Sequence, residues 1–213
     1  MSISDLKKVS IAAVGAGVMA GMADAADTKA VDKLIAGIKD KDDQVRTKAW
    51  LGAGQVGSAA VRPLAKVMTD KEPEVARAAK RGLWKLVRHA GRPGAGAERK
   101  AVDDELVVLL GDDQPASVRR EVLWMLSEIG GRKSVDAIAA LLSNRQLRED
   151  ARMTLQRIRS KKAVAVLKAA LQAAPEDFKL NIAQSLRQRG VEVDGLACVK
   201  LVPTKKTNVK PLK

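Results

Sequence analysis

A helical pattern recurs along the chain, and it constrains the fold more than any other feature. Each copy begins with an apolar residue and has small or apolar residues four and eight positions further on. The copies begin at Val45, Val75, Val118, Leu147 and Phe178. This spacing places the three side chains on one face of an α-helix. Acidic or turn residues precede most copies, as Asp42 and Asp43 precede the first, and such residues favour the start of a helix.

A second helical segment precedes each copy. These segments share an Ala-Val or Ser-Val start with Leu, Ile or Val at helical spacing, and they read KAVDKLIAGIKD, AAVRPLAKVMTD, KAVDDELVVLLGD, KSVDAIAALLSN and KKAVAVLKAALQ. The unit is therefore a pair of helices of about thirty residues, and a period of this size is typical of a solenoid. We expect an all-α fold, an α-solenoid of about five two-helix repeats over residues 28–190.

One interval between copies is longer than the others. It measures 43 residues, whereas the others measure 29 to 31. The surplus falls in RHAGRPGAGAERK, where Gly91, Pro93, Gly94 and Gly96 disfavour a regular helix. We therefore predict an inserted loop at 90–98, and insertions in repeat arrays often belong to a binding face.

The N-terminal residues 1–25 support two interpretations. Lys7 and Lys8, a following apolar run and the small residues Ala23 and Ala25 are typical of a secretory signal, which slightly favours an exported or periplasmic protein. Residues 3–22 also partly match the repeat spacing. In this second interpretation they form a degenerate first helix of the array, and the protein is cytoplasmic. The apolar run is too short for a transmembrane helix, so we expect no transmembrane segment in the mature chain.

The pattern stops after Gly190. Residues 191–213 are predicted to form a basic C-terminal tail, in which VEVDGLACVKLV alternates weakly around a turn at Asp194-Gly195 and favours a small hairpin. Lys200 to Lys213 carries five Lys and no acidic residue. The whole chain has 39 basic and 25 acidic residues, a net charge of +14, which favours acidic partners.

The repeat resembles a known family of short repeats. DDQVRTKAWLGAGQVGSAAVRPLAKVMTD and QPASVRREVLWMLSEIGGRKSVDAIAALL are similar to the HEAT-like repeats first described in phycobilisome lyases. The resemblance implies an armadillo-like helical α-solenoid. It does not select a function, because the family includes lyases, scaffolds and binding adaptors.

The residues that catalysis would need are scarce. Phycobilin lyases share the repeats, but nothing further ties this chain to a chromophore. HEAT-like deoxyhypusine hydroxylases hold iron with His-Glu pairs, and this chain has one His, His89. The alkylpurine DNA glycosylases are basic helical-repeat proteins, but no matching motif is found here. We interpret His89 as a helix-end residue and Cys198 as a small packing residue. We expect no enzyme activity, catalytic residue, cofactor or metal ligand.

The resemblance implies that the second helix of each pair lines the concave face of the array. Basic residues and two Trp residues recur there, and the predicted binding stripe consists of Arg46, Trp50, Lys80, Trp84, Arg119, Arg148, Arg152, Lys179 and Arg187. Such a stripe can bind carboxylates or phosphates. In the opposing interpretation, Arg46 and Arg119 pair internally with turn residues such as Asp42 and Asp112, and the Trp residues are partly buried packing residues.

These observations favour a non-enzymatic scaffold or adaptor that binds a protein partner through the concave face, the inserted loop or the tail. The excess of basic residues is compatible with an acidic partner. One alternative is nucleic-acid or polyanion binding by the basic face, which would weaken steeply with salt. Another is a non-catalytic partner subunit of a lyase-like enzyme.

Overall fold

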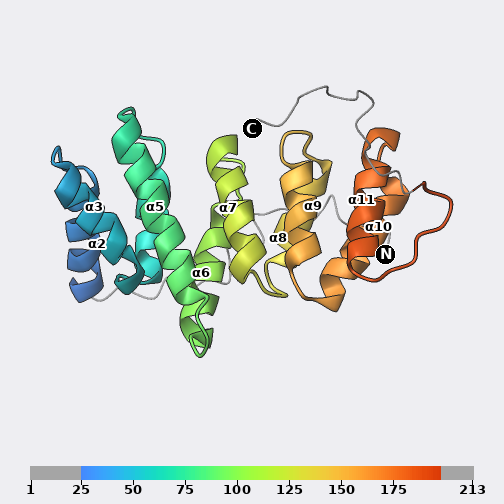
Figure 1. Ribbon diagram of the computed structural model, residues 1–213, viewed down its shortest axis with the longest axis horizontal. Coiled ribbons are helices and arrows are strands. Elements are labelled where there is room, and N and C mark those ends of the chain that lie inside the picture. The colour runs from blue at the N-terminus through green and yellow to red at the C-terminus, as the bar shows by residue number, and fades with distance from the viewer. Residues whose placement is uncertain (1–24, 198–213) are drawn as a thin grey trace, which may run out of the picture.

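The computed structural model describes residues 25–197, which form an array of paired α-helices (Figure 1). The first helices of the pairs are α2 (Ala25–Ile38), α4 (Val61–Val67), α6 (Gly96–Val108), α8 (Val135–Ala140) and α10 (Lys161–Ala173). The second helices are α3 (Asp43–Gly52), α5 (Pro73–Ala90), α7 (Ala116–Ile129), α9 (Arg148–Arg157) and α11 (Glu176–Gln188). The predicted all-α solenoid of five two-helix repeats is confirmed.

The second helices stand side by side along the longest axis of the molecule. Figure 1 shows them in the order α3, α5, α7, α9 and α11, and each contacts the next one. Among the first helices, α2 contacts α4, α4 contacts α6, and α8 contacts α10. We call the outward surface of α3, α5, α7, α9 and α11 the second-helix face. It holds most of the predicted binding stripe.

Local sequence signals set several helix boundaries. The Asp42 carboxylate accepts a hydrogen bond of 2.7 Å from the Gln44 backbone N–H and caps α3. The Ser160 hydroxyl caps α10 in the same way, by accepting from the Lys162 N–H at 3.1 Å. Pro73 is the first residue of α5, where its missing N–H leaves no helical hydrogen bond unmade. Short 3-10 turns complete α3 (Ala53–Gln55), precede α4 (Ser58–Ala60) and follow α8 (Leu141–Ser143).

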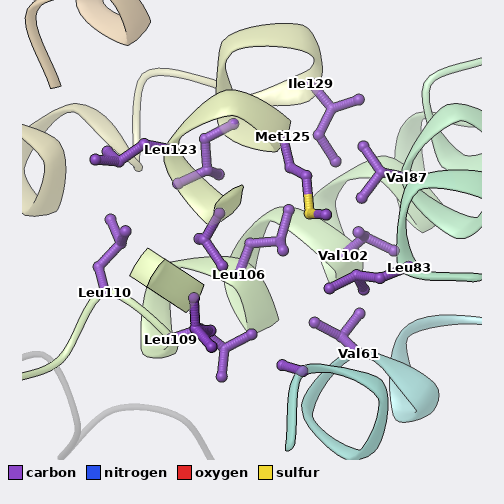
Figure 2. Packing of buried hydrophobic residues seen from close by; sticks show 14 of the residues in the cluster. Val61, Leu83, Val87, Val102, Leu106, Leu109, Leu110, Leu123, Met125 and Ile129 are labelled. Atoms are coloured by element: carbon purple, nitrogen blue, oxygen red, sulfur yellow. The ribbon is translucent and has the colours of Figure 1, made fainter. Parts of the chain in front are cut away.

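One continuous apolar core runs through the array, and Leu, Val and Ala supply most of it. In Figure 2, Leu83 and Val87 of α5 meet Val102 and Leu106 of α6 and Met125 of α7 between the helices, and all five are at most 1% exposed. Each repeat buries its apolar face against the preceding and following repeats, which is how a solenoid is stabilised.

The predicted loop at 90–98 is wrong in its extent. Helix α5 continues through Ala90 and α6 begins at Gly96, so the connection is only 91–95. The surplus residues lengthen the two helices instead. Gly94 takes the left-handed backbone conformation with φ 83°, which lets the chain turn sharply. Gly96 is tolerated in α6 because it occupies the first position rather than the interior.

Salt bridges hold the 91–95 connection in place. Arg92 Nη1 donates to Glu98 Oε2 at 2.7 Å and to the His89 carbonyl at 2.8 Å, and Arg92 Nη2 donates to Glu98 Oε1 at 2.6 Å. His89 lies in the last turn of α5, with Nε2 3.8 Å from Glu98 Oε2. His89 therefore lies at a helix end, as predicted from the sequence.

The remaining terminal predictions fall partly outside the described residues. Residues 1–24 and 198–213, including Cys198, lie there. Residues 191–197 are described and contain no strand, so this part of the expected hairpin is not formed.

Candidate binding surface

Two arginines of the predicted stripe bind inside their own repeats. Arg46 donates to the carbonyls of Asp40 and Lys41 at 2.9 and 2.8 Å and to the Asp43 carboxylate at 3.1 Å. The Arg119 side chain is 7% exposed, and its Nη2 lies 2.8 Å from Asp112 Oδ1. The internal pairing of Arg119 is the expected one. Arg46 uses Asp43 and turn carbonyls rather than Asp42, whose carboxylate caps α3.

The cations of the last two repeats also have partners. Arg148 Nη2 lies 2.6 Å from Asp177 Oδ2, and its guanidinium carbon stands 4.7 Å from the ring centre of Phe178. Arg152 bonds Glu149 at 2.7 Å and Gln156 at 3.1 Å, and it also donates to the Ser185 hydroxyl.

Two further cations of the stripe, both on α11, bind residues close to them in sequence. Lys179 pairs with Glu176, one turn earlier on α11. Arg187 turns toward the chain that follows α11 and donates to the carbonyls of Val193, at 3.1 Å, and Leu196. The C-terminal part of the predicted stripe is thus largely neutralised or used for packing.

A recurring clamp, which the sequence did not reveal, joins neighbouring second helices. Lys80 and Trp84 of α5 both donate to Glu121 of α7, with the indole Nε1 at 3.0 Å from the carboxylate. One repeat later, Arg120 and Trp124 of α7 both donate to Asp150 of α9, each at 3.1 Å. The two donors of each clamp are four residues apart and share one helix face. The carboxylates occupy equivalent positions, three residues after Val118 and Leu147.

A groove between α3 and α5 is the part of the second-helix face with exposed cations beside apolar surface. We call it the α3–α5 groove, and its volume is about 730 Å³. Its apolar lining consists of Trp50, Leu51, Met68, Ala76 and Trp84. Its cations are Arg77, Lys80, Arg81, Lys85 and Arg88, all on α5 and all exposed. The structure therefore brings Trp50, Lys80 and Trp84 of the predicted stripe together and adds four cations that the sequence reasoning missed.

Two guanidinium groups stand over the two indoles of the groove. The Arg81 guanidinium carbon is 5.7 Å from the ring centre of Trp50, and that of Arg88 is 5.1 Å from the ring centre of Trp84. Both Trp residues are half-buried and pack against the core, as the packing interpretation expects. A guanidinium stacked on a ring keeps its edge donors free to bind an oxyanion.

Titratable groups with shifted pKa values lie mostly at turns and helix junctions. The Arg92 guanidinium lowers the pKa of Glu98, and the Arg148 guanidinium lowers the pKa of Asp177. Burial raises the pKa of Asp103, which is 6% exposed and accepts a 2.6 Å hydrogen bond from Ser134 Oγ. Within residues 25–197, no cluster of three or more His, Cys, Asp or Glu side chains could hold a metal ion. None of the described helices is long and apolar enough to cross a membrane.

The stacked helix pairs, the continuous core and the open second-helix face define an α-solenoid of short helical repeats. The family model of HEAT repeats matches residues 8–84 and 104–187, and the chain belongs to that family. The gap in the match, 85–103, covers the end of α5, the 91–95 connection and the start of α6. The first match includes residues 8–24, which lie outside the described part of the chain. No curated protein matches this sequence. HEAT arrays are helical scaffolds that commonly mediate protein interactions.

Proposed function

We propose that this protein is a non-enzymatic scaffold or adaptor that binds a protein partner on the second-helix face. The α3–α5 groove carries this proposal, because exposed cations there lie beside apolar and aromatic surface. Such a mixture is typical of protein interfaces, in which Trp and Arg supply much of the binding energy.

The distribution of charge supports a protein partner over a long polyanion. A nucleic acid would need a continuous row of available cations along the array. From α7 to α11, however, Arg119, Arg148 and Arg152 are engaged with carboxylates of the same chain. On α5, Arg81 and Lys85 form no ion pair with any described residue.

The test is site-specific photo-crosslinking of the full chain in its native cells. A photoreactive residue replaces Leu51, which is 48% exposed and lines the groove, or in a control Lys168, which is exposed on the first helix α10. We expect a defined protein partner to be crosslinked from position 51 and not from position 168, and to bind the purified chain.

Two results would contradict the proposal. In the first, the same proteins are captured equally from both positions. In the second, capture at position 51 is lost after nuclease treatment, and an oligonucleotide binds the purified chain with an affinity that falls steeply with salt. The second result would establish nucleic-acid binding instead.

A further inference from the structure

The cations of the α3–α5 groove form a regular row. Arg77, Arg81 and Lys85 follow one another at intervals of four residues on α5. Four helical residues rise about 6 Å, so the three side chains lie on one helix face about 6 Å apart. The contact of Arg81 with the Trp50 ring shows that this face is directed toward α3.

A second row on α5 faces the next repeat and is already engaged. Lys80 and Trp84 hold Glu121, and Arg88 lies 3.9 Å from Glu128. Arg77 pairs with Glu74 in the first turn of α5. Among residues 25–197, no ion pair is formed by Arg81 or Lys85. The groove lining has five cations, and three carboxylates of the chain contact them.

The opposite side of the groove is apolar. Trp50 and Leu51 of α3 and Met68 at the end of α4 line it, and Leu51 is 48% exposed. The lining runs along α5 from Ala76 to Arg88, a rise of about 18 Å. An extended chain of five or six residues has this length, at about 3.3 Å per residue.

These features fit an extended peptide in which acidic and apolar residues alternate. Successive side chains of an extended chain point to opposite sides, and every second side chain is about 6.6 Å further on. Carboxylates would then face Arg77, Arg81 and Lys85 at nearly their own spacing, and the apolar residues would face Leu51, Met68 and Trp50.

We propose that the α3–α5 groove binds an extended acidic segment of a partner protein, with alternating carboxylate and apolar side chains. This inference rests on the proposed scaffold function and specifies its site and ligand chemistry. Arg81 and Lys85 contribute the charge, and Trp50, Leu51 and Met68 contribute the apolar contact.

The test measures binding of fluorescent peptides to the full chain by anisotropy. The probe is Glu-Leu-Glu-Leu-Glu-Leu-Glu. One control peptide has Gln in place of Glu, and another has the same composition in blocks, with four Glu followed by three Leu. We expect the alternating peptide to bind about tenfold more tightly than either control, because the Gln peptide lacks the charge and the block peptide lacks the matched spacing.

Variants locate the binding. We expect Arg81→Gln/Lys85→Gln to weaken binding of the alternating peptide about tenfold, whereas Arg132→Gln/Lys168→Gln changes it less than about twofold. The control pair is exposed, lies outside the groove and removes the same charge. Circular dichroism and thermal unfolding confirm that both variants fold, and the peptide controls test the inference even where a variant does not.

Each contrary result overturns the inference. Equal binding of the alternating and block peptides would show that only net charge matters. Equal weakening by both double variants would place the binding elsewhere. Tighter, Arg81-dependent binding of a twelve-nucleotide oligothymidylate would assign the groove to nucleic acid. If a partner found by crosslinking still binds Arg81→Gln/Lys85→Gln, the groove inference fails and the scaffold function stands. If the same proteins are captured equally from positions 51 and 168, the scaffold function itself fails.

Discussion

Phe178 is the only Phe in the chain, and its replacement by Ala provides a quantitative test of the repeat architecture. The side chain lies in α11, is 1% exposed, and has the Arg148 guanidinium 4.7 Å from its ring centre. Removing a buried Phe side chain costs about 3–5 kcal/mol. Loss of the cation–π contact adds about 0.5–1 kcal/mol.

The location of the loss is the more informative result. In a solenoid each repeat contacts only its neighbours, so the damage is expected to stay within the last repeat and its contact with α9. Hydrogen exchange, followed by mass spectrometry, measures protection repeat by repeat. A loss of 3–5 kcal/mol corresponds to an exchange rate in α10 and α11 faster by roughly two to four orders of magnitude. Protection of α4 to α7 should remain nearly unchanged.

Leu180→Ala is the matched control. Leu180 lies two residues away on the same helix but is 48% exposed, so its replacement should change stability by about 0.5 kcal/mol or less. A uniform loss of protection across all repeats in Phe178→Ala would refute the nearest-neighbour reasoning. Unchanged protection of α11 would refute the assignment of Phe178 to the core.

Three further predictions concern packing, the clamp and pH. In urea unfolding, Gly37→Ala should destabilise the protein by about 1–3 kcal/mol although Ala favours helices, because the new Cβ would lie 2.8 Å from Ala49 Cβ. In the control Gly52→Ala the new Cβ meets no atom within 4 Å, so stability should stay the same or rise, and the opposite order of the two variants would contradict the close α2–α3 packing. A double-mutant cycle of Trp84→Phe with Glu121→Gln should give a coupling of about 1 kcal/mol in urea unfolding, and zero coupling would mean that the clamp does not stabilise the array. Because the pKa of Asp103 is raised, the folded state binds the Asp103 proton more tightly than the unfolded state does. The stability of the native chain relative to Asp103→Asn should therefore increase as the pH falls through the folded-state pKa, and parallel stability curves of the two proteins between pH 7 and 4 would contradict this.

The sequence predicted the fold because apolar spacing and helix-start residues, which act over a few positions, define each helix of the repeat. Apolar residues at helical spacing, as from Val118, indicated the buried faces, and Asp42 and Pro73 indicated helix starts. Composition alone overestimates the loop at 90–98, because it counts Gly96 against a helix wherever that residue lies. A glycine at the first position of a helix lacks the penalty that it carries in the interior.

The binding surface was predicted less well, because the sequence gives the position of a cation but not its partner. Arg148 follows Leu147 directly, as Arg119 follows Val118, yet a carboxylate of the same chain engages it. The Glu121 and Asp150 clamps join side chains that are 37 and 26 residues apart in sequence for the two Trp donors. Such pairing depends on how one helix stands against the next, and periodicity does not describe it.

The sequence alone thus determined the repeat, its helices and the excess of basic residues, since propensity, capping and hydrophobic spacing act over a few residues. Only the tertiary structure decided which cations remain available. The stacking of α3 against α5 brings Arg81 over Trp50 and leaves Lys85 exposed in the groove, whereas carboxylates of the next second helix engage Arg120 and Arg148. Side chains from different repeats meet only after the helices have packed, so the location of the groove is a property of the assembled array.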